Sequence, residues 1–162
     1  MRFLNIYLFL LAMVIGMEVS IGAFLAPTIF FPQNIIGEGV LSHFQSGQLM
    51  TNVFVKYNYV LLAVSVISFI YESVNLKFDK SFYKKTSSFA LSFIVLVLAL
   101  AFVFYFTDYI LEAQKLGAEA TQNEQFGKIH STSELVMKIM MIAQILLFFI
   151  KFPCACCAVK KD

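Results

Sequence analysis

Four long apolar runs, separated by shorter polar links, dominate the pattern of hydrophobic and polar positions along the chain. A helix needs about 20 mainly apolar residues to cross a bilayer, and each run reaches that length. The pattern predicts membrane-spanning helices at about residues 3–31, 48–75, 87–112 and 131–152. Pro153 is expected to end the last helix because it lacks an amide hydrogen, which leaves residues 153–162 as a short cytoplasmic tail. The predicted fold is an all-α, integral membrane four-helix bundle that forms a single transmembrane domain.

The two links on the side away from the termini differ in character. In residues 32–46, four apolar residues recur at helical spacing, which predicts a short helix lying on the membrane surface. In residues 113–127, the abundance of Ala, Glu, Gln and Lys predicts that the third helix extends a few turns into water. Ser131 and Glu134 have the spacing of a capping box, which favours a start of the fourth helix there. The four apolar residues of the first link are Ile36, Val40, Leu41 and Phe44.

Composition supports a membrane protein and argues against several other classes. The chain of 162 residues is 60% hydrophobic and 14% charged, with a mean hydropathy of +0.81, whereas soluble domains have about 45–50% apolar and 25% charged residues. A net charge of +2 with a single arginine offers no basic face for nucleic acid. We find no Gly-rich phosphate loop, nucleophile elbow or zinc-protease motif, so an enzyme is not expected.

Basic residues gather on the side of the membrane that both termini are predicted to share. The positive-inside rule makes this side cytoplasmic, so we expect both termini inside and a multi-pass protein of the cytoplasmic (inner) membrane. The abundance of Lys, Phe, Ile and Asn favours a bacterial source. The first apolar run resumes after Glu18, so it is predicted to be a span and not a cleaved signal peptide. The basic residues are Arg2, Lys77, Lys80, Lys84, Lys85, Lys151, Lys160 and Lys161.

Glu18 is the clearest candidate for function, because an ionisable side chain deep in a bilayer costs about 2.5–3.5 kcal/mol and needs a partner or water. It lies about 22 Å along the first helix, in the predicted outer half of the membrane. Gly22 and Ala26 follow at i+4 and i+8 and predict a face where another helix approaches closely. Lys138 on the fourth helix has the same predicted depth and is the candidate partner. A structural ion pair and a working site both remain open.

Other polar residues gather in the same half of the predicted bundle and suggest a pocket. Lys56 and Asn58 on the second helix are the further pocket candidates, and Asn58, Ser65 and Glu72 follow one heptad line. A proton or ion path along Glu18, Lys138 and Glu72 is one hypothesis for this arrangement.

Metal and haem sites are alternative hypotheses for the same region. His130, Glu134 and Met141 form one stripe that could bind a metal with Glu18, and the neighbouring Met137 and Met140 favour soft Cu(I). Haem between His43 and His130, the only histidines, is a further possibility. At the C-terminus, Cys154, Cys156 and Cys157 are candidate thiolate ligands for a soft metal, although their spacing lacks the paired pattern of a zinc site. No cofactor follows from the residues alone.

Three short stretches carry a family resemblance: GAFLAPTIFFP at residues 22–32, SGQLMTNVFVKYNYV at 46–60 and FGKIHSTSELVMKI at 126–139. They resemble the bacterial family called domain of unknown function 4149, which is similar to the eukaryotic transmembrane-protein-205 group and, more distantly, to CopD-type copper-resistance proteins. The resemblance implies a four-helix membrane protein with no established activity, and it adds weight to the copper hypothesis. The pattern matches at Pro27, Phe30, Phe54, His130 and Ser133.

Two functions are compatible with these observations. The first is a small membrane protein that handles an ion, a metal or a small solute through a polar pocket in the outer half of the bundle. The second is a non-catalytic interaction or assembly subunit of a larger membrane complex, or a homo-oligomer, with charges that fix the register of its helices. In both, membrane lipids are the surrounding partners.

Overall fold

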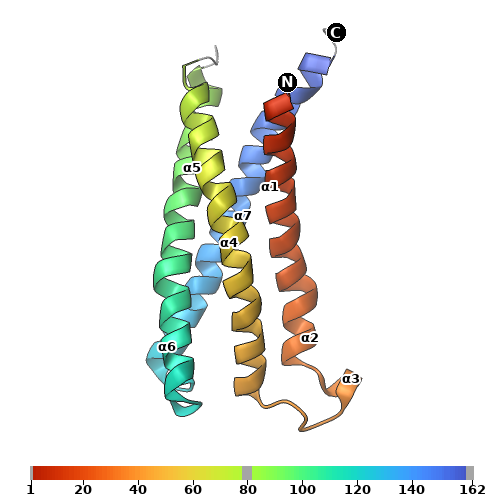
Figure 1. The fold of residues 1–162 in the computed structure, drawn as a ribbon, viewed down its shortest axis with the longest axis vertical. Coiled ribbons are helices and arrows are strands. Elements are labelled where there is room, and N and C mark those ends of the chain that lie inside the picture. The colour runs from red at the N-terminus through yellow and green to blue at the C-terminus, as the bar shows by residue number, and fades with distance from the viewer. Residues whose placement is uncertain (1, 78–81, 160–162) are drawn as a thin grey trace.

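A computed structural model describes residues 2–77 and 82–159, apart from the side chains of Arg2, Asn34 and residues 154–159. Within these residues, four helices are long and apolar enough to cross a membrane. They form an elongated bundle in which the start of the first helix and the end of the last lie at the same end (Figure 1). We call this the terminal end and the opposite one the distal end. The predicted four-helix membrane bundle is confirmed, whereas the side on which the termini lie stays a prediction.

Two of the four spans contain a π-helical turn, a wide turn closed by i→i+5 hydrogen bonds. The first span comprises α1 (Arg2–Ser20), the π turn η1 (Ile21–Leu25) and α2 (Ala26–Phe30), and a one-turn helix α3 (Gln33–Ile36) follows it. The second span is α4 (His43–Asn75). The third comprises α5 (Phe82–Ala101), the π turn η2 (Phe102–Thr107) and α6 (Asp108–Leu116), followed by the 3₁₀ turn η3 (Glu119–Thr121). The fourth is α7 (Glu124–Val159).

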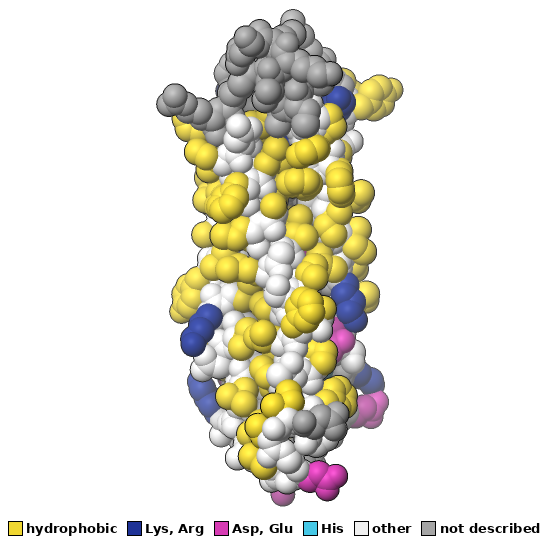
Figure 2. Space-filling view, turned by 90° about the vertical axis from the view of Figure 1, so that its right-hand side faces the viewer, with side chains coloured by type: hydrophobic (Ala, Val, Ile, Leu, Met, Phe, Trp, Pro, Cys, Tyr) yellow, Lys and Arg dark blue, Asp and Glu magenta, His cyan; other side chains and the backbone are white. Residues whose placement is uncertain are grey.

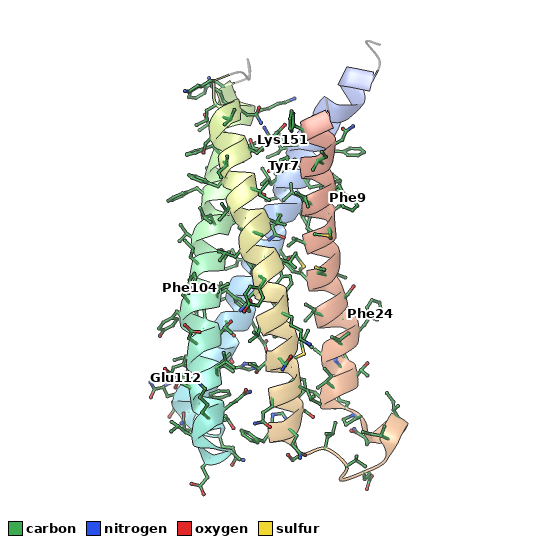
Figure 3. All side chains as sticks on the ribbon, viewed as in Figure 1. Tyr7, Phe9, Phe24, Phe104, Glu112 and Lys151 are labelled. Atoms are coloured by element: carbon green, nitrogen blue, oxygen red, sulfur yellow. The ribbon has the colours of Figure 1, made fainter. Side chains whose placement is uncertain are left out.

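The hydrophobic core runs through the middle of the bundle and into its terminal half. Small buried serines, Ser65 and Ser68 on α4 and Ser88 and Ser92 on α5, let these neighbouring helices approach each other. Many large apolar side chains face outward, and Phe9 and Phe24 point away from the bundle (Figure 3). Hydrophobic side chains also cover most of one long face, while charged ones gather toward its distal end (Figure 2). This distribution suits a lipid-facing surface.

The prediction of a surface helix in residues 32–46 is wrong. Only the single turn α3 forms, and Gly37 and Gly39 adopt positive φ values of 91° and 73°, which favour glycine and interrupt the helix. Ser42 then starts α4 with a complete capping box, in which its side chain accepts from the Gln45 amide. Phe44 consequently belongs to the second span.

The predicted limits of the last two spans also need correction. The third span begins at Phe82, before the predicted position 87, and continues to Leu116, about one turn past the predicted end at residue 112 and less than the few turns expected. The fourth begins at Glu124, where the Asn123 side chain accepts from the Phe126 amide, so Ser131 lies inside a helix and caps nothing. Pro153 does not end α7, because proline has a helix-compatible φ and removes a single backbone hydrogen bond.

A buried ion pair joins α4 to α7 near the terminal end. Lys151 Nζ lies 2.7 Å from Glu72 Oε2, and the two side chains are only 5% and 1% exposed. Tyr7 packs beside this pair, stacks on Tyr71 and lies close to Lys151 in Figure 3. The sequence placed Lys151 among the cytoplasmic charges, but here it neutralises a buried carboxylate.

We expect Lys151→Met to destabilise the protein by about 3–5 kcal/mol, because it leaves the Glu72 carboxylate buried without its cation. The double variant Glu72→Leu with Lys151→Met removes both charges and should recover most of the loss. The free energy of unfolding, measured by circular dichroism in mixed micelles, tests this. A Lys151→Met variant as stable as the wild type would contradict the structural role of the pair.

Candidate functional site

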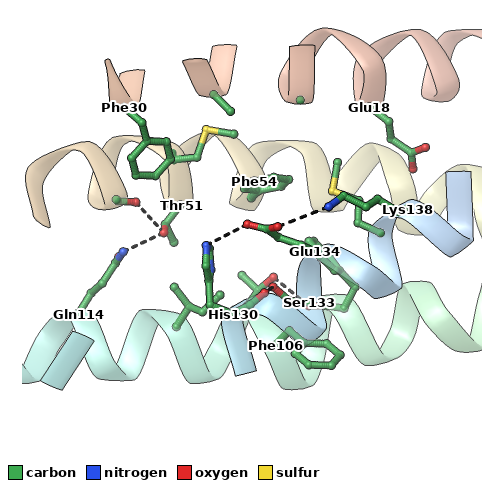
Figure 4. Close-up of a pocket in the computed structure, with 18 of the residues that line it drawn as sticks. Glu18, Phe30, Thr51, Phe54, Phe106, Gln114, His130, Ser133, Glu134 and Lys138 are labelled. Atoms are coloured by element: carbon green, nitrogen blue, oxygen red, sulfur yellow. Dashed lines mark hydrogen bonds and ion pairs between the residues drawn. The ribbon is translucent and has the colours of Figure 1, made fainter. Parts of the chain in front are cut away.

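A cavity of about 660 Å³ lies in the distal half of the bundle, and we call it the distal cavity. All four spans contribute to its walls. Gly22 and Phe30 line it from the first span, Phe54 from α4, Phe106 from η2, and Met137 from α7. Its walls are mainly apolar, with a few polar groups among the rings (Figure 4). This volume and this mixture of groups are typical of sites for small molecules.

The cavity exists because the helices separate where small residues stand. On the terminal side, α7 packs along α1, whereas further out α2 packs on α4. Gly22, Ala23 and Ala26 border the space between them, and a Cβ atom added at Gly22 would meet nothing within 4 Å. The predicted close approach of another helix is therefore wrong at Gly22, which leaves a space open, whereas Ala26 packs against the core.

Both π turns stand beside the cavity. The first, η1, precedes Pro27, which has no amide hydrogen and whose ring would crowd the carbonyl of Ala23 in a regular helix. The Ala26 amide bonds instead to the Ile21 carbonyl, five residues earlier. In η2, the Thr107 hydroxyl donates to the Phe102 carbonyl at 2.9 Å. Such wide turns occur frequently at functional sites.

Asn58 supports the cavity wall without lining it. Its side-chain amide donates to the Thr107 hydroxyl at 2.9 Å, and both side chains are buried. A second polar bridge lies further out, where Gln114 Nε2 donates to the Thr51 hydroxyl at 2.9 Å. These two bridges hold the third span against α4 at the level of the cavity.

Glu18 lines the distal cavity and is only 2% exposed. The Tyr57 hydroxyl on α4 donates to its Oε1 at 2.5 Å, and the side chain of Gln144 on α7 lies beside the same carboxyl group. Its other oxygen, Oε2, is buried and accepts no hydrogen bond of normal length and angle from the described residues, although the Gln144 side chain lies beside the carboxyl group. The carboxyl group is thus held from two helices while the hydrogen bonding of one oxygen is incomplete.

A polar stripe on α7 forms another wall. Glu134 accepts from both sides, with Oε1 3.4 Å from His130 Nε2 and Oε2 3.5 Å from Lys138 Nζ (Figure 4). All three residues line the cavity, and their side chains are about half or more exposed. The ion pair predicted between Glu18 and Lys138 is not formed, because Lys138 pairs within its own helix at i−4. The two residues nevertheless border the same cavity, as their predicted depth implied.

Lys56 does not belong to the site, and its prediction as a pocket residue is wrong. It lies on the exposed side of α4. At 3.6 residues per turn, it points about 200° away from Phe54 and Asn58, which both face inward. Asn58, Ser65 and Glu72 are all buried, so the predicted heptad line does face the bundle interior.

The described residues do not form the predicted metal set. No three His, Cys, Asp or Glu side chains among them come close enough to hold a metal ion. His130, Glu134 and Met141 do line one wall. Both carboxylate oxygens of Glu134 are already paired there with the basic side chains of His130 and Lys138. The side chains of Cys154, Cys156 and Cys157 lie outside the described part, so a thiolate site there stays a prediction. His43 packs on Phe30 and His130 on Phe126 at the cavity wall.

Glu72 is remote from the site, so the predicted path through Glu18, Lys138 and Glu72 does not form. It lies about 22 Å along α4 from Tyr57, the partner of Glu18, with buried Leu61 and Val64 between them. Sequence reasoning also missed Tyr57, Gln144 and Thr107. Gln144 could have been noticed, since an amide in the middle of an apolar span needs a partner just as Glu18 does.

Comparison with known proteins places most of this architecture in one family. The family model described as a domain of unknown function, DUF4149, matches residues 9–119. The matched range includes three of the four cavity walls and Glu18 but ends before the polar stripe of α7. No curated protein and no solved structure matches the chain.

We expect Thr107→Val to destabilise the protein by about 1–3 kcal/mol, because it keeps the shape of the side chain but leaves the Asn58 amide without its acceptor. Thr107→Ser keeps the hydroxyl and should lose clearly less. Unfolding of both variants in mixed micelles measures the difference. Equal stabilities for the Val and Ser variants would show that the hydrogen bond does not support η2.

Proposed function

The chain belongs to the DUF4149 family, and we propose that it is a membrane protein that binds and handles a small solute in the distal cavity. The observation that carries this proposal is the buried carboxyl group of Glu18, which borders the cavity with its Oε2 atom unsatisfied. With both termini in the cytoplasm, the cavity would lie in the outer half of the cytoplasmic membrane. No catalytic step is proposed.

The energetics support a site over a purely structural carboxyl group. Burying a polar atom without a hydrogen bond costs about 1–3 kcal/mol in proteins. Other buried polar atoms of this bundle also lack a hydrogen bond, for example Asn58 Oδ1 and Ser65 Oγ, but these belong to neutral side chains, whereas Glu18 is an ionisable group that borders a cavity. The buried pair of Glu72 and Lys151 shows how this bundle compensates a carboxylate when the role is structural. Glu18 receives only neutral partners from the chain, and a solute that carries a positive charge or a hydrogen-bond donor would compensate its carboxyl group.

The proposal predicts that a small apolar carbodiimide enters the cavity and modifies Glu18. Dicyclohexylcarbodiimide adds to a carboxylic acid without a leaving group, so intact-protein mass and peptide sequencing locate the adduct. Gly22→Leu should reduce the labelling rate about tenfold or more by filling the space that Gly22 leaves open. Gly16→Leu is the matched control, since Gly16 lies in the same span, also has open space around it and does not line the cavity.

Several results would count against this function. Glu18→Gln should abolish the adduct, and Glu72 should remain unmodified because Lys151 holds it in a separate packed region. Equal labelling of the two leucine variants would show that the reagent does not reach Glu18 through the cavity. If wild-type Glu18 does not react at all, the cavity is closed in the membrane, and the assembly-subunit hypothesis becomes the better account of the buried charge.

A further inference from the structure

The charges around the distal cavity favour a positively charged ligand. Its lining contains two carboxyl groups, Glu18 and Glu134, one lysine, Lys138, and the two histidines. With neutral histidines the formal charge of the lining is therefore −1. Lys138 is already engaged by Glu134, so the carboxyl group without a basic partner among the described residues is Glu18. A cation would balance the site, whereas an anion would approach an uncompensated carboxylate.

The rest of the wall favours an apolar body on that cation. Six phenylalanines from all four spans line the cavity: Phe30, Phe44, Phe54, Phe102, Phe106 and Phe126. Aromatic faces attract organic cations, by about 2 kcal/mol or more where the contact is desolvated. A hydrated inorganic ion would gain little from such walls, because its water shell needs polar groups that the rings do not provide.

The cavity also reaches the surface where such a molecule would arrive. Val19 on α1 and Glu134 and Lys138 on α7 line it and are exposed to the surroundings of the bundle. Glu18, which precedes Val19 in α1, lines the same cavity and is itself buried. An amphiphilic cation that partitions into the membrane interface could enter here with its charged group beside the polar stripe.

We infer that the ligand class of the distal cavity is a monovalent organic cation with an aromatic or aliphatic body. Its ammonium group lies against Glu18, and its body packs among the phenylalanines. This inference rests on the proposed function and specifies the chemistry of its solute. It assigns Glu18 as the residue that selects charge, while Glu134 serves to neutralise Lys138 at the mouth.

A set of three probes of similar shape tests the class. Benzyltrimethylammonium carries the charge, neopentylbenzene is its neutral isostere, and 3-phenylpropanoate has the opposite sign. The cation should protect Glu18 from dicyclohexylcarbodiimide at a concentration about tenfold or more below that of either other probe. Protection by neopentylbenzene alone would overturn the inference but leave the proposed solute site intact. Protection by none of the three would overturn the inference. If Glu18 is labelled as fast in Gly22→Leu as in the wild type, the proposed function itself is overturned.

Two variants with the same change of charge identify the anchor. In equilibrium dialysis with radiolabelled benzyltrimethylammonium, Glu18→Gln should weaken binding about tenfold or more, whereas Glu134→Gln should have a clearly smaller effect. Glu18→Gln should still bind neopentylbenzene like the wild type, which shows that the cavity is intact. Equal losses in the two variants would mean that only the net charge matters, and this result would contradict the role assigned to Glu18.

Discussion

The need to satisfy a carboxyl group inside a membrane-spanning bundle is the constraint on which this structure depends. Hydrocarbon cannot solvate Glu18, so donors must come from the protein. Tyr57 on α4 and Gln144 on α7 meet it there, and the first span is thereby fixed against two others. Beyond this point the first span carries Gly22, beside which the space stays open. The distal cavity forms because the contacts of Glu18 fix the first span at one level, and the small residue one turn further on leaves space open.

The two buried carboxyl groups divide the bundle into halves with different properties. Glu72 is matched by Lys151 in a packed region, so the buried carboxyl group of the terminal half is electrostatically balanced. Glu18 has neutral partners only, and the distal half holds an open volume whose lining has an excess of one carboxyl group. One half is thus suited to stability and the other to a ligand. The π turns η1 and η2 lie on the ligand side of this division.

Sequence patterns predicted the features that depend on residues close together in the chain, namely the helices and the side of the second span that faces inward. The four spans follow from the length of apolar runs, and the inward direction of Asn58, Ser65 and Glu72 follows from a seven-residue spacing. Glu18 was recognisable because a charge is rare in such a run. Its actual partners were not predictable in the same way, since they depend on how each helix rotates about its axis. For the same reason Lys138 was assigned to Glu18 although it bonds to Glu134 on its own helix.

A structure of the protein with 4-bromobenzyltrimethylammonium tests most directly whether Glu18 anchors an organic cation in the distal cavity, because bromine can be located by its anomalous scattering. We expect bromine among the phenylalanines of the distal cavity and the ammonium group beside Oε2 of Glu18. This expectation would be contradicted by an empty or collapsed cavity in which Lys138 has turned to pair with Glu18. Such a result would make the carboxyl group part of the scaffold and leave the family without a solute site here.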